Sequence, residues 1–110
     1  MLGDYVWYTK NSNNRRTLPV GSLLPNDLGF FDMNGNVLEW MQNGDYAYTP
    51  RIRKALDKED KGMVSNTNNR LLRGGSFSGS ASNVRSSDRY SYRPDVPSLS
   101  NGFRPSRTFR

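Results

Sequence analysis

The chain of 110 residues contains neither cysteine nor histidine. Without cysteine it can form no disulfide and has no thiol nucleophile. Without histidine it cannot build a Ser-His-Asp triad, and zinc sites of the usual Cys/His type are excluded. No apolar run approaches the roughly 20 residues that span a bilayer, and the first residues do not form a signal peptide. We therefore expect a soluble chain without thiol or imidazole chemistry.

Large apolar residues are also scarce. Leu, Ile, Val and Phe together number 22, which is close to the lower limit for a self-sufficient core. Two tryptophans and six tyrosines add area that can be buried. The composition predicts one small, loop-rich domain over residues 1–110.

Positive charge is concentrated in the last 41 residues, from Arg70 onward. Up to Asn69 eight basic residues balance eight acidic ones, whereas the remainder has eight arginines, no lysine and two aspartates. A mixed Lys/Arg surface would indicate nucleic-acid binding. Arginine alone favours forked hydrogen bonds to carboxylates and carbonyls, so we do not expect nucleic acid as a partner.

Short apolar runs separated by turn signals predict an α+β fold with short strands. Strands are expected over Val37–Met41, in RLLRGGSF, where the strand runs into a double glycine, and around Asn83–Arg89. A last strand, broken by Pro105, is expected in GFRPSRTF, and the chain opens with a strand-like YVWYT. The charge-rich stretch after Asn43 is expected to be an exposed loop, with a short helix over Ile52–Lys61 as the alternative. The predicted core contains six apolar residues: Phe30, Leu38, Trp40, Leu71, Phe77 and Phe103.

The stretch DMNGNVLEWM, which begins at Asp32, combines two acids with a turn dipeptide and an apolar strand. A turn at Asn34-Gly35 can fold Asp32 back toward Glu39. In the strand, Val37 and Glu39 face the same side. A hard cation such as calcium prefers carboxylate and carbonyl oxygens. The carboxylates of Asp32 and Glu39, with the carbonyls of Gly35 and Val37, could therefore surround one ion.

Two other interpretations of these acids stay open. Glu39 could instead form a buried pair with one of the C-terminal arginines. Asp32 and Glu39 could also be an acid/base pair, as in glycoside hydrolysis, although the cation site explains their spacing as well.

Four motifs occur in order along the chain: LPVGSLLPNDLGFFDMNGNVLEWM, RLLRGGSF, the pair Arg85 and Arg89, and GFRPSR. Together they resemble the formylglycine-generating enzyme (sulfatase-modifying factor) domain family, from about Thr17 to Arg107. The resemblance covers roughly the C-terminal half of the usual domain, which leaves room for a missing N-terminal segment or a partner chain. It implies a variant of the C-type lectin fold with short antiparallel strands, and structural calcium at the four positions named above.

The family's catalytic groups are absent. Its oxidase members use two copper-binding cysteines shortly after a Gly-Gly-Ser-aromatic motif, which is Gly74–Phe77 in this sequence, and neither cysteine is present. Its sulfoxide synthases need iron held by histidine. We therefore expect no copper and no catalytic residue, and a divergent or truncated oxidase is the enzymatic alternative.

The Ser- and Tyr-rich segment that follows the Gly-Gly motif is the candidate binding surface. Tyrosine gives contact area at low entropic cost, and serine gives adaptable hydrogen bonds. The candidate contact residues are Ser78, Ser80, Tyr90, Tyr92 and Arg93. The expected partner is a protein or small-molecule ligand. In the family's retroelement-diversified members the variable residues lie in this interval, so a variable binding protein is a further interpretation.

Overall fold

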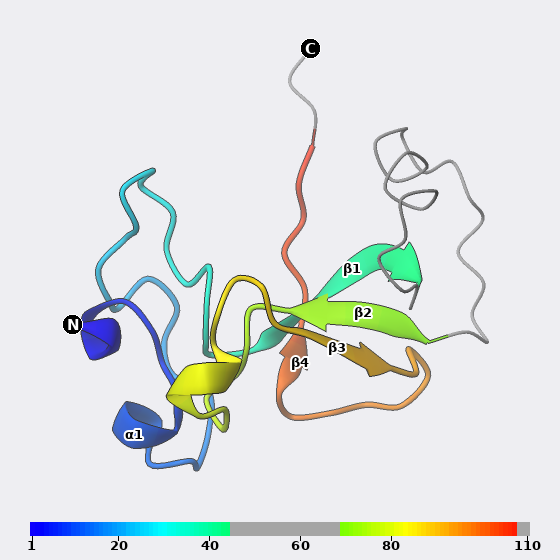
Figure 1. Cartoon of the computed structure of the whole chain (residues 1–110), viewed down its shortest axis with the longest axis horizontal. Coiled ribbons are helices and arrows are strands. Elements are labelled where there is room, and N and C mark those ends of the chain that lie inside the picture. The colour runs from blue at the N-terminus through cyan, green and yellow to red at the C-terminus, as the bar shows by residue number, and fades with distance from the viewer. Residues whose placement is uncertain (45–68, 108–110) are drawn as a thin grey trace.

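The computed structural model describes residues 1–44 and 69–107. Four strands form one sheet in the order β3-β2-β1-β4 (Figure 1). Their bounds are β1 Leu38–Gly44, β2 Arg70–Arg73, β3 Arg89–Tyr92 and β4 Asn101–Gly102. The helical turns are η1 Leu2–Asp4, α1 Thr9–Ser12 and η2 Ala81–Asn83. The stretch for which a loop or a short helix was predicted, including Ile52–Lys61, lies outside the described residues.

The sheet is mixed. β1 pairs with β2, and β2 with β3, in antiparallel fashion, while β1 pairs with β4 in parallel fashion. The strands predicted over Val37–Met41 and at the start of RLLRGGSF correspond to β1 and β2, although β1 continues to Gly44. The strand expected around Asn83–Arg89 begins only at Arg89, because η2 occupies the start of that stretch. The prediction of a last strand in GFRPSRTF is wrong, because β4 covers Asn101–Gly102 and ends where that motif begins. At Gly102 a Cβ atom would lie 2.7 Å from Cγ2 of Val37.

The prediction of a strand at the N-terminus is wrong. This segment connects η1 to α1, and its one sheet-like contact is an isolated parallel bridge between Trp7 and Gly35. The side chain of Asn11 explains the helical turn. It accepts a hydrogen bond from the backbone N–H of Tyr8 (2.9 Å) and donates to the carbonyl oxygen of Val6 (2.9 Å). These two hydrogen bonds satisfy the N–H of Tyr8 and the carbonyl of Val6, which in a strand would have to pair with a neighbouring strand.

The apolar core among the described residues is small. It consists of Val6, Leu71, Leu72, Phe77 and Val84. Leu71 and Phe77 confirm the prediction. Leu38 and Trp40 are only half-buried. The predicted burial of Phe30 and Phe103 is wrong, because these side chains are 54% and 81% exposed.

The backbone around the two exposed phenylalanines explains the error. Phe30 lies in a loop closed by Asn26, whose side-chain Oδ1 accepts hydrogen bonds from the N–H groups of Leu28 and Phe30 (3.0 Å each). Phe103 follows the last residue of β4 and has left the sheet. Both rings therefore border a surface cavity instead of the core.

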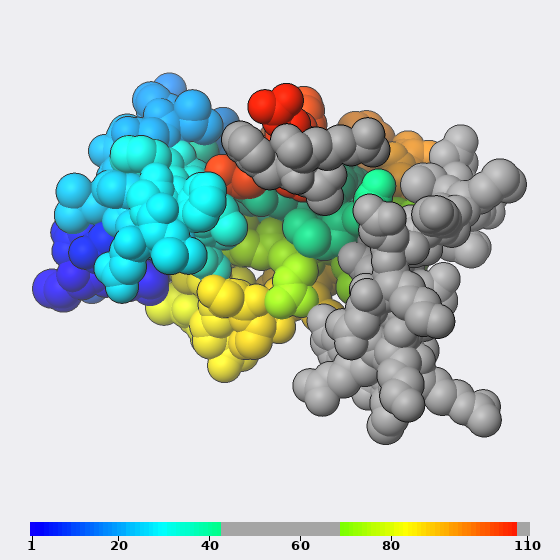
Figure 2. Space-filling model, turned by 90° about the horizontal axis from the view of Figure 1, so that it is seen from above, coloured from blue at the N-terminus to red at the C-terminus, as the bar shows by residue number. Residues whose placement is uncertain are grey.

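A buried asparagine fixes the N-terminal segment to the sheet. Asn36 is buried. Its side-chain amide accepts a hydrogen bond from the backbone N–H of Leu18 (2.9 Å) and donates one to the backbone carbonyl of Leu18 (3.0 Å). Its backbone N–H donates to the carbonyl of Trp7, and its carbonyl accepts from the N–H of Phe77. Figure 2 shows the blue-to-cyan N-terminal residues gathered on one side of the molecule, bordered by the red C-terminal residues.

Candidate functional site

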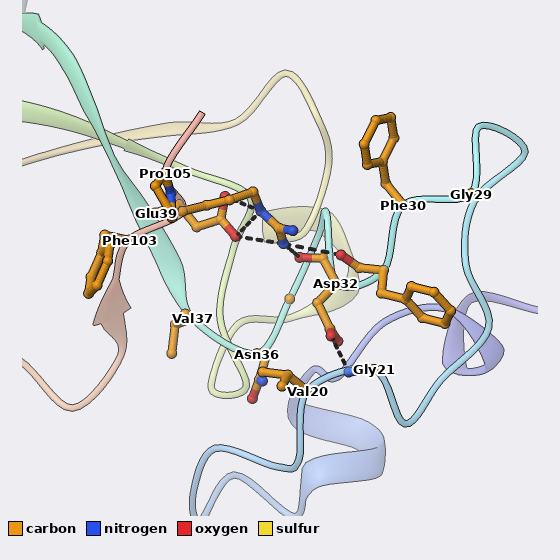
Figure 3. A pocket seen from close by; sticks show the side chains of 13 residues that line it. Val20, Gly21, Gly29, Phe30, Asp32, Asn36, Val37, Glu39, Phe103 and Pro105 are labelled. Carbon is orange, nitrogen blue, oxygen red and sulfur yellow. Dashed lines mark hydrogen bonds and ion pairs between the residues drawn. The ribbon is translucent and has the colours of Figure 1, made fainter. Parts of the chain in front are cut away.

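All four residues of the predicted cation site line one cavity of about 540 Å³. The cavity lies between the loop that precedes β1, the start of β1 and the segment after β4 (Figure 3). Its remaining walls are mostly apolar and include Val20, Phe30, Phe31, Phe103 and Pro105. Asp32, Gly35, Val37 and Glu39 thus border a common space.

Arg104 occupies the position beside Glu39. Its Nε donates to both carboxylate oxygens of Glu39, at 3.0 and 3.2 Å, and Nη2 lies 2.9 Å from Oε1. The same Nη2 donates to the carbonyl oxygens of Phe31 (3.1 Å) and Asp32 (2.8 Å). The Glu39 side chain is 14% exposed and that of Arg104 39% exposed, so the pair is partly shielded from water. The observed contact is therefore the one that the alternative interpretation predicted, in which Glu39 pairs with a C-terminal arginine.

The oxygens around this cavity are of the kind that a hard cation binds. The guanidinium of Arg104, however, holds the Glu39 carboxylate and the Asp32 carbonyl, and the Asp32 carboxylate accepts a hydrogen bond from the N–H of Gly21 (2.7 Å). The described residues contain no group of three or more Asp, Glu, His or Cys side chains placed to hold a metal. A cation at this place would have to compete with Arg104 for Glu39.

Gly35 has a packing role that the cation hypothesis did not include. Its φ is +78°, and a Cβ atom there would lie 2.4 Å from the carbonyl oxygen of Trp7 and 2.6 Å from Cγ1 of Val6. Its N–H donates to the carbonyl of Gly74. The absence of a side chain at Gly35 therefore allows the N-terminal segment to lie against the turn before β1.

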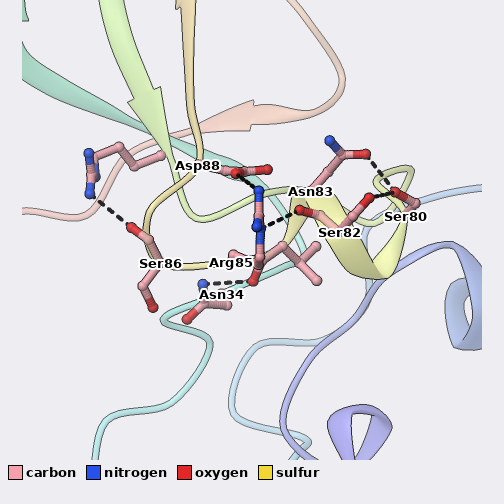
Figure 4. A network of polar contacts seen from close by, with 9 residues as sticks. Asn34, Ser80, Ser82, Asn83, Arg85, Ser86 and Asp88 are labelled. Atoms are coloured by element: carbon pink, nitrogen blue, oxygen red, sulfur yellow. Dashed lines mark hydrogen bonds and ion pairs between the residues drawn. The ribbon is translucent and has the colours of Figure 1, made fainter.

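The first part of the candidate binding segment surrounds η2. Ser78 exchanges a hydrogen bond with Ser76 (Oγ–Oγ 3.0 Å). Ser80 contacts the hydroxyl of Ser82 (2.8 Å) and donates to Oδ1 of Asn83 (2.6 Å), as Figure 4 shows. Ser78 and Ser80 are both exposed, and their hydroxyls hold the turn together while remaining accessible.

The second part of that segment lies on and after β3. Tyr90 and Tyr92 are 39% and 41% exposed, and Arg93 is exposed just beyond the strand. Arg93 donates to both carboxylate oxygens of Asp95. This hydrogen bond is the main reason why the pKa of Asp95 is lowered and that of Arg93 is raised.

The two parts of the segment are separate groups on the surface. Ser78 and Ser80 lie beside α1, since the carbonyl of Gly79 accepts hydrogen bonds from the backbone and side chain of Thr9 (2.9 Å each). The tyrosines lie on the edge strand β3. Within the described part of the chain, no hydrogen bond or ion pair joins Ser78 or Ser80 to Tyr90, Tyr92 or Arg93.

The C-terminal arginines bind carbonyls and carboxylates. This was predicted because the residues from Arg70 onward contain arginine but no lysine. Arg85 donates to the carbonyl of Ser82 and to the carboxylate of Asp88, both at 2.8 Å (Figure 4). Arg73 donates to the carbonyl of Ser86 (2.8 Å). Arg73 thus fixes the loop between η2 and β3 to the end of β2, and the bonds of Arg85 hold the loop itself together.

Sequence reasoning missed two residues that build the site. It pointed to the C-terminal arginines as partners of Glu39 but did not identify Arg104, because the pairing spans 65 positions in the sequence. It also gave Asn36 no role. The motif Asn-Gly-Asn contained the signal, since asparagine tolerates the left-handed conformation that Asn36 adopts, with φ of 62°.

None of the helices in residues 1–44 and 69–107 is long or apolar enough to span a bilayer.

Comparison with known proteins places this geometry in context. Residues 1–109 match the family described as sulfatase-modifying factor enzyme 1-like domain. Among solved structures, Treponema denticola variable protein 1 has a TM-score of 0.73 and 31% identity, covering 93% of this chain and 35% of that protein. CarF has a TM-score of 0.55 and 30% identity, covering 79% and 26% respectively. The chain thus spans about a third or less of the length of these two proteins.

A shorter match involves the chaperone protein LppX of Paenibacillus barcinonensis, which is 45% identical over 40 residues. That match covers 36% of this chain and 14% of LppX. The structural likenesses, together with a small mixed sheet in largely irregular surroundings, confirm the predicted α+β fold of the C-type lectin type.

Proposed function

The chain belongs to the sulfatase-modifying factor enzyme 1-like domain family, and from that premise we propose that it is a non-catalytic binding module. One observation carries the proposal. Tyr90 and Tyr92 are exposed on a strand whose neighbour β2 supplies the buried Leu71 and Leu72. Aromatic side chains presented by a fixed strand offer contact area without a large loss of entropy on binding.

The residues after the Gly-Gly motif support binding over oxidation. Gly75, Ser76 and Phe77 are buried and form a tight turn, and the next side chains are the hydroxyls of Ser78 and Ser80. A hydroxyl replaces a thiolate poorly, both as a nucleophile and as a soft ligand of copper. The whole sequence contains no cysteine and no histidine. We accordingly assign no catalytic residue.

The proposed contact surface consists of Ser78, Ser80, Tyr90, Tyr92 and Arg93. Because the serines lie beside α1 and the tyrosines on β3, a ligand that contacts both must reach from one group to the other. A protein or an extended oligomeric ligand fits this shape better than a compact small molecule.

Screening of immobilised peptides and glycans tests the proposal. We expect the chain to retain at least one class of probe, and the double variant Tyr90→Ser/Tyr92→Ser to lose it without a change in melting temperature. Tyr5→Ser is the matched control, since Tyr5 is a similarly exposed tyrosine (44%) in the N-terminal segment. Equal retention by the chain and both variants would contradict the proposed surface.

The likeness to a protein named variable protein 1 supports a more specific role. We propose that the interval from Ser78 to Asn101 varies among copies of this domain while β1 and β2 are kept. Sequencing the gene from independent isolates tests this proposal. Substitutions concentrated in that interval would support it, and substitutions spread evenly over β1, β2 and the interval would refute it.

We also propose calcium as a structural ion at Asp32, Gly35, Val37 and Glu39. The support is that these residues line one cavity and provide carboxylate and carbonyl oxygens. Binding there requires Glu39 to exchange Arg104 for the ion.

A further inference from the structure

The cavity beside Glu39 is walled largely by apolar side chains that solvent reaches. Val20 and Phe103 both line it and are 80% and 81% exposed. The other apolar residues that line it are Phe30, Phe31, Val37 and Pro105. Its volume of about 540 Å³ is within the range of roughly 300–1,000 Å³ that is usual for small-molecule sites. The cavity therefore has the size and the walls of a site for a small molecule with an apolar body.

The charged groups of this cavity do not balance. Its charged lining residues are Asp32, Glu39 and Arg104. Arg104 pairs with the carboxylate of Glu39, whereas it contacts Asp32 only at the backbone carbonyl. Figure 3 shows the Asp32 side chain directed toward Gly21 and away from the Glu39–Arg104 pair. The lining therefore has one negative charge in excess, and that charge lies on the Asp32 carboxylate.

The Asp32 carboxylate can accept further hydrogen bonds. Its Oδ2 accepts one from the backbone N–H of Gly21 (2.7 Å). Within residues 1–44 and 69–107, no hydrogen bond or ion pair involves its Oδ1. An ionised carboxylate has about four acceptor positions and no donor. A cationic donor would both bond to Oδ1 and balance the charge, and such charge-assisted hydrogen bonds are the strong ones.

We propose that this cavity binds a small organic amine. The ammonium group donates to Oδ1 of Asp32, and the apolar body lies against Val20 and the other apolar walls. The amine leaves the pair of Glu39 and Arg104 intact, whereas calcium would require Glu39 to leave Arg104. Both ligands use Asp32, so they exclude each other. This site is distinct from the contact surface of serines and tyrosines and adds a second ligand to the binding function proposed above.

NMR titration of the full chain with three ligands of similar size tests the inference. At pH 7 the ligand 2-phenylethylamine is a cation, 2-phenylethanol is neutral and 3-phenylpropionate is an anion, and EDTA in the buffer excludes calcium. The backbone amide signals of Gly21 and Val37 report on the cavity. We expect the dissociation constant of the amine to be about tenfold or more below those of the other two ligands. Because the chain has a net charge of +6, non-specific attraction would favour the anion instead.

Asp32→Asn is the most informative variant. Asp32 has φ of 53°, a region in which asparagine is well tolerated, and the asparagine oxygen can still accept from Gly21. We expect this variant to keep its melting temperature and to lose the preference for the amine over the alcohol. Val20→Ser should weaken amine binding by about threefold or more, since it removes apolar contact area. Asp27→Asn is the matched control and should bind the amine unchanged, because Asp27 is an exposed acid of the same loop that does not line the cavity.

Each contrary result has a defined meaning. Equal affinity for the amine and the alcohol, or tighter binding of the propionate, would refute the choice of a cation. An unchanged preference in Asp32→Asn would refute the role of its carboxylate. The three ligands and Val20→Ser decide the question even if Asp32→Asn lowers the melting temperature. Failure of all three ligands to shift the signals would overturn the inference, while the binding function of the tyrosines would still be judged by the probe screen.

Discussion

Replacement of Gly35 by alanine should destabilise the domain by about 2–5 kcal/mol. The residue has φ of +78°, and an L side chain in that region costs about 1–2 kcal/mol. The new Cβ would also lie 2.4 Å from the backbone oxygen of Trp7. That atom cannot move like a flexible side chain, so a further cost of about 1–3 kcal/mol is expected for overpacking. Urea unfolding followed by tryptophan fluorescence measures the sum.

Gly21 provides the matched control for this substitution. Its φ is +68°, but no atom lies within 4 Å of a Cβ placed there. Gly21→Ala should therefore destabilise the domain by no more than the about 1–2 kcal/mol that the left-handed backbone costs. Alanine also reduces the conformational entropy of the unfolded chain, which offsets about 0.4–1 kcal/mol of that cost. Equal urea midpoints for Gly35→Ala and Gly21→Ala would refute the argument that the close approach of Trp7 requires a glycine.

Four further predictions concern the core, the cavity and the binding surface. Leu72→Ala, at a residue 1% exposed, should lower the free energy of unfolding by about 2–5 kcal/mol in the same urea assay. Arg104→Lys should lower it by about 1–3 kcal/mol in thermal melts, because lysine cannot fork between Glu39 and two carbonyls; an unchanged melt would contradict this. In calorimetric titrations, calcium should bind Arg104→Gln more tightly than it binds the unmodified chain, and it should not bind Glu39→Gln. The absence of binding heat with all three proteins would refute the ion site. In an NMR titration, the Asp95 carboxyl should have a pKa below its ordinary value, so that its pair with Arg93 persists until the pH falls through that lowered pKa. Arg93→Gln should raise the titration midpoint of Asp95.

Parts of the fold that depend on local pattern could be predicted from the sequence. β2 brings Leu71 and Leu72 into the core, and the Gly74-Gly75 pair after it ends the strand with two positive φ angles. The turn before β1 was expected at Asn34-Gly35. Its left-handed residues are Gly35 and Asn36, one position later, because Asn36 is held there by Leu18.

Contacts between distant segments could not be predicted. β4 has two residues and pairs with β1 in parallel, which no periodicity in so short a segment can indicate. Phe103 looks like a core residue by composition, yet it lies beyond the end of β4 and is exposed. The partner of Glu39 was limited to the C-terminal arginines by charge. Only the fold selects Arg104, because β4 brings that residue beside the start of β1.

The central proposal is that this domain binds a partner and does not oxidise one. The most direct test incubates the chain with copper, oxygen and a cysteine-containing sulfatase peptide, and then labels any aldehyde with a hydrazide. The absence of thiols and imidazoles predicts no labelled peptide above that of a copper-only control. Aldehyde that appears in proportion to the amount of protein would contradict the account.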